Sequence, residues 1–503
     1  MVALCYFYLM RFWCTVIMMC LGSFAHAKKV YEFNSVCQQA YKEIIQLKLA
    51  NGQELIAKAR QQNPDNLIPV ALENYIDFFK LFFNEDPAEY KVFKDNVDER
   101  IELLKEGDKT SPFYRFCLGM VYLQKAGVDL KFGERWSAGW DFRRGYNYIK
   151  ENKKEFPTFI PNDLLHGPMQ AMIGTIPKSY KWIASLFGMK GSVKKGMAAT
   201  RAFVESSDPW ARVFSSEGIF LYSYLMFYVE NRKDDVIPFI QSKKLDISHN
   251  HLFAFLAVSL SMNNKQTLFT ERVLQNIDHS PEYLQTATWD YYRGMVKLHQ
   301  LKTAESISHL TRFAKNFKGK SFLKEAYQKL SWCYYLQGNI QMAERTRKEV
   351  LSKGGTTTDS DKKALKDAKS ATWPNILLLK VRLLNDGGNN TEALNLLKDK
   401  SINDFQKTEE QLEFAYRMGR INDDLKNDAP AINYYLQAIS IGEDRKEYFA
   451  SRAAVQLGQI YERQGKKDLA IKYYERCLAM DDHEYKDAID QRAKAGIERC
   501  KGN

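Results

Sequence analysis

The sequence predicts an all-α protein, a helical-repeat solenoid made of antiparallel helix pairs. The most direct sign is a repeat in which Gly419 and Gly458 occupy matching surroundings, 39 residues apart. Small residues let two helices approach closely and aromatic rings fill the space between them, so the pattern predicts a helix–turn–helix unit. The positions assigned to this template are Gly419, Ala431 and Tyr435 in the first copy and Leu457, Gly458, Tyr461, Gly465, Ala470 and Tyr474 in the second.

Composition and length favour helices over a turn-rich β fold. The 503 residues include only 13 prolines and 27 glycines, while aromatic residues make up 13%. At about 100–200 residues per domain, a chain of this length predicts roughly two to four domains or one extended solenoid. We therefore expect a stack of helix pairs that presents a surface.

The first element, residues 1–27, has the pattern of a secretory signal peptide. Arg11 precedes an apolar run over residues 12–21, and Ala25-His26-Ala27 follows. The apolar run is shorter than the roughly 20 residues that cross a bilayer. We expect cleavage before Lys28, and therefore an exported protein that is periplasmic or associated with the outer membrane.

Two alternatives concern this leader: Cys20 could be acylated as in a lipoprotein, and Met10 could be the true start. Without residues 1–27, the remaining cysteines are odd in number and widely scattered, which is not a disulfide framework. We expect small buried side chains at Cys117, Cys333 and Cys477.

The net charge of +12 falls by one when Arg11 is removed, and positive and negative residues are interspersed along the chain. Such a surface is solvated and has a mild preference for acidic partners. Because the sequence predicts an exported protein, we do not expect it to bind nucleic acid.

Residues 28–165 predict degenerate helical repeats. We expect a first helix pair over 36–50 and 54–60, broken at Asn51-Gly52, and another helix over 67–83. Ser111-Pro112 then opens a helix in which the repeat motif recurs. The residues of that motif are Leu118, Gly119 and Tyr122, and the predicted partner helix supplies Trp136, Trp140, Phe142 and Tyr146.

Residues 166–280 predict an irregular helical middle region. The glycine-punctuated apolar stretch 166–196 favours a helical hairpin packed inside the array, while its lysines leave contact with a membrane surface open as an alternative. Residues 219–228 are apolar and aromatic apart from Ser223, which predicts a buried helix too short to span a bilayer.

Residues 281–503 predict the clearest repeats. A polar loop over 352–360 separates two helix pairs, and a charged helix over 485–501 is suited to cap the last repeat with a polar outer face. The template positions in the earlier pair are Tyr327, Leu330, Tyr334, Gly338 and Ala343, with a looser match at Leu377, Val381, Leu384, Gly388, Ala393 and Leu397.

The repeat pattern resembles the tetratricopeptide repeat (TPR), and the chain resembles exported tetratricopeptide-repeat proteins of Gram-negative bacteria. It is also distantly similar to the tetratricopeptide repeat protein 39 family. The stretches that carry this wider resemblance are 173–177, 188–191, 317–327 and 382–388. The resemblance implies an all-helical scaffold without catalytic residues. The spacing of 39 residues and Asp482 in place of a closing proline depart from the repeat consensus.

Known catalytic and cofactor motifs are missing from the sequence. It contains no C-x-x-C, no H-E-x-x-H and no G-x-S-x-G motif. His249-Asn250-His251 indicates a polar helix start rather than a metal site. The glycines and lysines of residues 188–196 lack the Gly-Lys-Ser/Thr that a phosphate loop requires. We therefore expect no cofactor, no metal and no enzyme activity.

The sequence thus predicts a non-catalytic exported scaffold that binds a protein or peptide in the cell envelope. The alternative is a structural component of the envelope that attaches to the membrane surface through residues 166–196. The identity of the partner is not encoded in any motif of the sequence.

Overall fold

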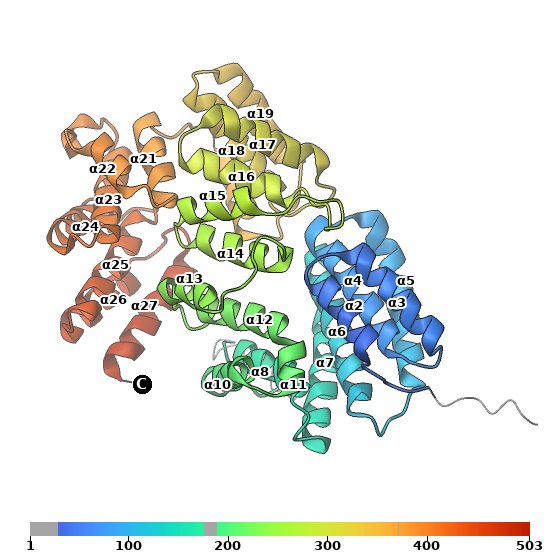
Figure 1. Ribbon diagram of the computed structural model, residues 1–503. Helices are drawn as coiled ribbons and strands as arrows, with labels where there is room; N and C mark the ends of the chain where they lie inside the picture. Colours follow the sequence, from blue (N-terminus) through green and yellow to red (C-terminus); the bar gives the residue numbers. More distant parts are fainter. Residues whose placement is uncertain (1–28, 176–188, 371, 503) are drawn as a thin grey trace, which may run out of the picture. The chain divides into compact units, whose positions relative to one another are not determined.

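A computed structural model describes residues 29–175, 189–370 and 372–502, and within these ranges the chain is helical (Figure 1). The described residues form α-helices, one 3₁₀ turn and a single isolated bridge between Val30 and Asn66, with no β-strand. The predicted all-α class is therefore confirmed. The predicted signal peptide, residues 1–27, lies outside the described residues. Within the described ranges, every helix is too short or too polar to cross a bilayer.

The chain divides into two compact units, each of which has its own core. Unit 1 comprises the described residues up to Phe82, then Asp86–Leu225 and Ser280–Leu284, and unit 2 comprises Phe83–Glu85, Met226–His279 and the described chain from Gln285 onward. The helices α4 and α12 begin in unit 1 and end with residues assigned to unit 2.

Unit 1 is a set of packed antiparallel helices. The two longest, α6 and α7, form its tightest pair. Its helices are α2 (Ser35–Ile45), α3 (Leu49–Gln62), α4 (Ile68–Asn84), α5 (Pro87–Lys105), α6 (Pro112–Phe132), α7 (Arg135–Glu155), α8 (Pro161–Gly174), α10 (Val193–Glu205), α11 (Pro209–Val213) and α12 (Ser215–Tyr228).

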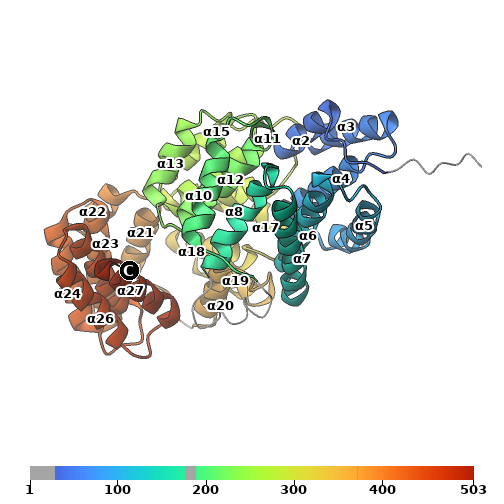
Figure 2. The ribbon, with the colours of Figure 1, turned by 90° about the horizontal axis from the view of Figure 1, so that it is seen from below.

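Unit 2 is a series of helix hairpins, and Figure 2 shows α23, α24, α26 and α27 grouped together near its C-terminal end. Its helices are α13 (Lys233–Ser242), α14 (His251–Asn263), α15 (Thr267–Asn276), α16 (Thr288–His299), α17 (Thr303–Asn316), α18 (Leu323–Leu336), α19 (Ile340–Ser352), α20 (Asp359–Lys369), α21 (Ile376–Asp386), α22 (Asn390–Leu397), α23 (Thr408–Asp424), α24 (Asp428–Gly442), α25 (Phe449–Arg463), α26 (Lys467–Ala479) and α27 (Lys486–Lys501), with the 3₁₀ turn η2 at Ile402–Asp404.

Among the described residues, seven hairpins have a three-residue turn of the same geometry between their two helices. The middle residue of this turn is left-handed, and the amide of its third residue donates to the carbonyl five residues earlier, as Lys466 does to Tyr461. This is the Schellman geometry, which satisfies carbonyls at a helix end and reverses the chain. The left-handed residues are Leu47 in the pair α2/α3 and, in unit 2, Lys265, Leu301, Gly338, Gly388, Lys426 and Gly465.

The first of these turns corrects the predicted break at Asn51-Gly52. The chain reverses at Gln46–Lys48 instead, and α3 runs through Gly52. Gly52 is a packing residue, because a methyl group added to its Cα would overlap Ile44. Glycine often marks a turn in a sequence, whereas the turn here uses Leu47.

In unit 2, the first helix of each pair lies toward the inner side of the stack. The first helices of neighbouring pairs contact one another, as α21 does with α23, α23 with α25, and α25 with α27, more closely than the second helices do. Helices on the concave side of a curved stack are closer together than those on the convex side. The first helices therefore form the inner face of unit 2.

Helix α20 is an inserted element that caps α18. Phe322 precedes α18 in a left-handed conformation and supplies no side-chain cap. The fully buried carboxylate of Asp361 accepts from the amides of Phe322 at 2.7 Å and Glu325 at 3.1 Å. A carboxylate at this position satisfies the free amides of the first turn and complements the helix dipole.

Helix α7 is the partner helix predicted for α6, although Trp136 and Trp140 on it are exposed. Both residues lie on α7, as expected, but Trp136 is 84% exposed and Trp140 48% exposed, whereas Tyr146 is buried. The cause is their position on the first turns of α7, beyond the part of the helix that packs most closely against α6 through Gly119 and Gly145.

The described parts of segment 166–196 pack against protein. Gly167 and Gly196 bring α8 and α10 together, and an added methyl group on Gly167 would come within 2.6 Å of Thr200 Oγ1. The centre of the segment, residues 176–188, lies outside the described residues. The buried helix predicted over 219–228 is α12, although its last residue, Tyr228, is 57% exposed.

Candidate interaction surface

The two C-terminal hairpins share one internal packing scheme. A methyl group added to Gly419 would lie 2.5 Å from the ring of Tyr435, and one added to Gly458 would lie 2.5 Å from the ring of Tyr474. Only glycine leaves room for the aromatic ring of the second helix against the first. The repeat seen in the sequence is therefore a repeated glycine–tyrosine contact in α23/α24 and α25/α26.

Each of these tyrosines also donates to a carboxylate on its partner helix. Tyr435 OH donates to Asp423 at 3.2 Å, and Tyr474 OH donates to Glu462 at 2.7 Å. The same carboxylates accept from an arginine of the next first helix, Asp423 from Arg463 at 2.8 Å and Glu462 from Arg499. The repeat thus links neighbouring hairpins as well as the helices within one hairpin.

The other predicted repeat positions play four different roles. Leu118, Leu457, Ala343, Ala431 and Ala470 are fully buried. Gly338 and Gly465 are left-handed turn residues with open space beside their Cα atoms. Gly119 contacts Ile149, and Tyr122 stacks on Tyr148. Tyr461 stacks on Tyr473, and Tyr327, Leu330 and Tyr334 line a groove of about 380 Å³ between α17, α18 and α19.

The inner face of unit 2 carries a series of basic side chains on successive first helices. We call Lys329 of α18, Arg382 of α21, Arg417 and Arg420 of α23 and Arg452 of α25 the cationic ladder. Three of its members, Arg382, Arg417 and Arg452, recur every 35 residues. The repeat therefore places them at equivalent positions along the stack.

Aromatic rings hold these cations in place. Lys329 Nζ lies 4.0 Å from the centre of the Trp332 ring, and Arg382 lies 5.0 Å from the same ring. Arg417 lies over Tyr416, and Arg452 lies 5.6 Å above Tyr448. Such cation–π contacts fix a charged head without neutralising it. Lys329 and Arg417 are buried, whereas Arg382, Arg420 and Arg452 are half-buried, so the last three are the members that an anion can reach.

Carboxylates neutralise only part of the ladder. Arg417 pairs with Glu413 at 2.9 Å, Arg420 with Asp424 at 3.2 Å, Arg382 with Asp386 at 3.6 Å and Lys329 with Glu325 at 3.7 Å. Among the described residues, Arg452 has no ion-pair partner, and neither has Arg492 of α27, which lies close to it. The C-terminal end of the ladder is therefore its least neutralised part.

The pKa values of groups within this face report a positive electrostatic field. Desolvation alone would raise the pKa of Asp386, yet the nearby Arg382, Arg417 and Lys265 lower it to about 2. Burial and the proximity of Arg420 lower the pKa of Lys265 to about 8. Burial and the charges of Arg492, Arg452 and Arg420 also lower the pKa of Lys233. Negative charge is favoured on this face and further positive charge is disfavoured.

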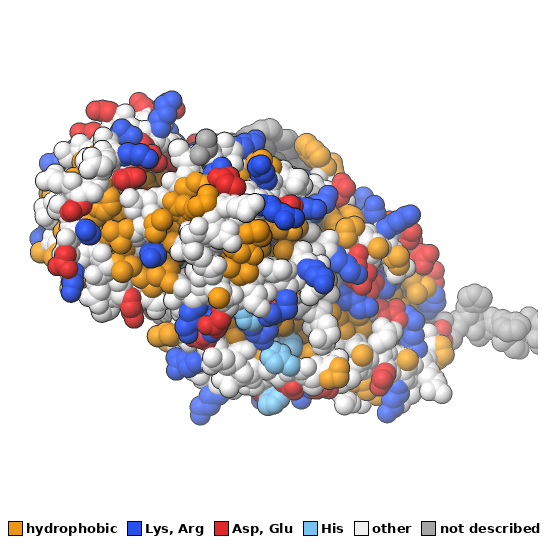
Figure 3. Space-filling model, turned by 90° about the horizontal axis from the view of Figure 1, so that it is seen from above, with side chains coloured by type: hydrophobic (Ala, Val, Ile, Leu, Met, Phe, Trp, Pro, Cys, Tyr) orange, Lys and Arg blue, Asp and Glu red, His pale blue; other side chains and the backbone are white. Residues whose placement is uncertain are grey.

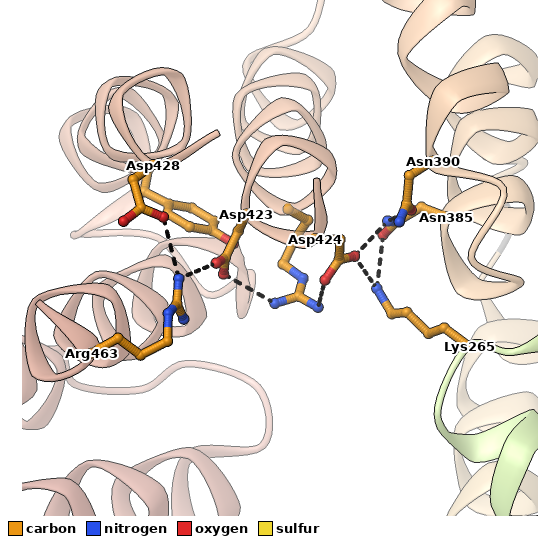
Figure 4. A network of polar contacts seen from close by, with 9 residues as sticks. Lys265, Asn385, Asn390, Asp423, Asp424, Asp428 and Arg463 are labelled. Carbon is orange, nitrogen blue, oxygen red and sulfur yellow. Dashed lines mark hydrogen bonds and ion pairs between the residues drawn. The ribbon is translucent and has the colours of Figure 1, made fainter. Parts of the chain in front are cut away.

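A polar network at the turn ends of the hairpins fixes Arg420 and its neighbours (Figure 4). Lys265 Nζ lies 2.6 Å from Asp424, which also accepts from Asn385 at 2.8 Å. Arg420 bridges Asp424 and Asp423, and Asp423 pairs with Arg463. Several helices and turns are thereby held in register, so the ladder is presented by a rigid framework.

No group of His, Cys, Asp or Glu in the described ranges has the arrangement of a metal site. His251 Nε2 instead contacts the carbonyl of Asp278 at 2.7 Å, and Asn250 caps α14, in agreement with the helix start predicted at residues 249–251. The five cysteines in the described ranges are buried and free, as expected for packing residues.

Charges of both signs are interspersed on the face in Figure 3.

Sequence reasoning found the packing residues but missed the ladder. Glycines and tyrosines identified the hairpins because their types are unusual at fixed spacing. Arg382, Arg417 and Arg452 could have been found by their 35-residue period, but basic residues are abundant along the chain. Their shared face became apparent only once the first helices were placed side by side.

Two segments of the chain match the family model described as tetratricopeptide repeat. The matched residues are 412–444 and 451–483, which correspond to α23/α24 and α25/α26. These are the same two copies that the glycine–tyrosine pattern identifies. Among curated proteins, none matches the chain in sequence.

Three solved structures illustrate the kind of protein with which the chain aligns. The P58(IPK) TPR domain is 14% identical, with 81% of this chain and 93% of that chain covered and a TM-score of 0.21. The APC/C hetero-tetramer Cut9–Hcn1 is 12% identical, with 94% and 99% covered and a TM-score of 0.28. Yeast Tom70 is 13% identical, with 94% and 96% covered and a TM-score of 0.23. At these TM-scores, the alignments carry no information on partner or mechanism.

Proposed function

We propose that the chain is a non-catalytic scaffold that binds an acidic segment of a partner protein along the cationic ladder. Two tetratricopeptide repeats support a role in protein interaction, and the ladder lies on the inner face that such helix pairs share. The single observation that carries the acidic preference is that Arg452 of the ladder and the neighbouring Arg492 have no ion-pair partner among the described residues.

An extended acidic peptide matches this face better than a single anion does. The ladder places basic groups on α18, α21, α23 and α25 rather than around one point. The rings of Trp332, Tyr416 and Tyr448 are buried beneath the cations and hold them in place, so the basic side chains themselves contact the peptide. Aromatic and arginine side chains together are the usual energetic centres of protein interfaces.

The proposal is tested with fluorescein-labelled oligoglutamate, with oligoglutamine and oligolysine as comparison peptides. Fluorescence anisotropy should show saturable binding of oligoglutamate alone, and this binding should weaken as salt screens the charges. The double variant Arg452→Glu with Arg492→Glu should bind at least about tenfold more weakly, because like charges then face the peptide.

The matched control makes the same change of charge on the outer helix α26. Lys467 and Lys472 are exposed residues of α26, so Lys467→Glu with Lys472→Glu should leave binding unchanged. Equal loss in both double variants would show that net charge, rather than the ladder, attracts the peptide. Equal binding of all three peptides would refute the acidic preference.

The cellular location of this scaffold is a proposal that rests on residues 1–27 alone. The tripeptide Ala25-His26-Ala27 after an apolar run supports export and a periplasmic or outer-membrane-associated location. N-terminal sequencing of protein recovered from the envelope should give Lys28 as the first residue. A retained Met1 or an acylated Cys20 would contradict this form of export.

A further inference from the structure

Two tryptophans of unit 1 present much of their surface to solvent. Trp136 is 84% exposed and Trp140 is 48% exposed, one helical turn apart on α7. Leu130 near the end of α6 is 58% exposed. We call Leu130, Trp136 and Trp140 the tryptophan patch. Large indole rings are rarely left this exposed unless a partner covers them.

The patch surrounds the turn between α6 and α7. Gly133 forms this turn in a left-handed conformation, and the ring of Phe132 stacks on Tyr90 of α5 at 3.9 Å, which anchors the turn from below. A methyl group added to Gly133 or Gly139 would meet no described atom within 4 Å. The face around the tryptophans is therefore open, and the backbone that carries it is fixed.

The charges around the patch are predominantly positive at the surface. Asp129 and Asp141 are each 2% exposed and are engaged within the unit, Asp129 by Tyr90 and Asp141 by Lys125 and Arg144. Arg135 is exposed and has no ion-pair partner among the described residues. Arg143 lies 5.5 Å over the ring of Trp140. Glu134 of the turn is exposed as well, and the basic side chains of Arg135, Arg143 and Arg144 outnumber it.

From this arrangement we infer that the tryptophan patch binds the surface of a lipid bilayer that contains anionic headgroups. Tryptophan places its apolar ring at the boundary of the acyl chains and its N–H among the headgroups. Basic side chains beside it gain from the negative surface potential, by about 1 kcal/mol each, which is about fivefold in affinity.

A bilayer fits these residues better than a folded protein does. Protein interfaces centre on anchors set in packed pockets and bury about 800 Å² per partner. The patch consists of separate rings around an open turn, with Gly139 between the two tryptophans. Such rings can enter a soft interface one by one without a complementary surface.

The inference is independent of the proposed peptide binding and of residues 166–196. The ladder belongs to unit 2, whereas the patch belongs to unit 1. The described parts of residues 166–196 belong to α8 and α10, which pack against each other. A membrane contact of this chain is therefore assigned to α6 and α7.

Co-sedimentation of the full chain with vesicles tests the inference. Vesicles of phosphatidylcholine mixed with phosphatidylglycerol should bind the protein, and vesicles of phosphatidylcholine alone should bind it at least about fivefold more weakly. Trp136→Ser with Trp140→Ser should lower binding to the mixed vesicles about tenfold, because buried apolar area sets the strength of interfacial binding. Arg135→Gln should lower it about fivefold.

The matched control is Leu268→Ser, which removes a 63% exposed apolar side chain from α15 of unit 2 and should leave vesicle binding unchanged. All variants carry the same residues 1–28, so any binding by that segment is common to them. Circular dichroism should show an intact fold in each variant, since the substituted side chains are exposed.

A second readout locates the contact. The five cysteines in the described ranges are buried, so a bimane label introduced through Trp136→Cys should react selectively with the new residue. Its emission should shift to the blue with mixed vesicles, whereas a label at Leu268→Cys should not shift. Unchanged vesicle binding in the double tryptophan variant would overturn the inference. The inference would also be overturned if the chain bound no vesicles but formed a saturable complex with a protein, and the double tryptophan variant abolished that complex.

Discussion

The glycine–tyrosine contact that defines the repeat can be tested by adding one methyl group, in the variant Gly458→Ala. The new Cβ would lie 2.5 Å from Tyr474 Cε1 and 2.7 Å from Cδ1. The ring has no room to retreat, because Gly496 of α27 presses on its other side and Glu462 holds its hydroxyl at 2.7 Å. The perturbation is small and acts at one place.

Two opposing effects set the magnitude. Carbon atoms pack best at about 3.5–4.0 Å, so the helix or the ring must move by about 1 Å, and because the ring is confined on both sides the cost lies in the upper part of the overpacking range, about 2–3 kcal/mol. Alanine in a helix interior recovers about 1 kcal/mol relative to glycine. We expect Gly458→Ala to destabilise unit 2 by about 1–2 kcal/mol and to lower its melting temperature by roughly 2–8 °C.

Thermal and urea unfolding, followed by circular dichroism, measure this change, and two variants provide controls. Gly139→Ala adds a methyl group on α7 where no described atom lies within 4 Å, so it should stabilise its unit by up to about 1 kcal/mol. In a Tyr474→Ala background, Gly458→Ala should become neutral or stabilising, because the clash is gone. The reasoning fails if Gly458→Ala is neutral in the native background, or if the penalty persists without the ring.

Two further predictions concern the turns and a buried histidine. Lys426 is exposed and left-handed with φ 63°, so Lys426→Gly should stabilise unit 2 by about 0.5–1 kcal/mol. Gly465 occupies the equivalent turn with φ 74°, so Gly465→Lys should destabilise unit 2 by a similar amount. Urea unfolding should show equal and opposite shifts of the midpoint for the two variants, and shifts of the same sign would refute the prediction. Burial lowers the pKa of His299 to about 4, so protonation favours the unfolded chain, and stability should fall by up to about 3 kcal/mol as pH drops from about 6.5 to 4. Unfolding of His299→Gln over the same pH range should lack this component, and identical pH profiles for the two proteins would contradict it.

The fold class followed from the sequence because glycine and aromatic residues at this fixed spacing are typical of packed helix pairs. Gly419 and Gly458 mark close helix contacts, and Ser111-Pro112 and Asn250 mark helix starts that the structure contains. These signals are local, since they depend on the residue types within one helix or one hairpin. Local signals are the ones that a single sequence carries.

Features that depend on tertiary placement could not be predicted in this way. Leu47 adopts a left-handed conformation that its residue type does not favour, because the Schellman hydrogen bonds and the packing of α2 on α3 impose it. Trp136 is exposed although its residue type predicts burial. The cationic ladder joins residues from four helices, and only the stacking of first helices brings them to one face.

The central claim, that a partner protein occupies the inner face of unit 2, is tested most directly by site-specific photo-crosslinking in cells. Benzoylphenylalanine would replace Gln456, which is half-buried on α25 one helical turn after Arg452, and in a second strain Leu469, which is 40% exposed on the outer helix α26. The account predicts a discrete protein adduct from position 456, with the crosslink mapped to an acidic segment of the partner and abolished by Arg452→Glu with Arg492→Glu. An adduct from position 469 alone, or an adduct from position 456 that maps to a basic or neutral segment, would contradict it.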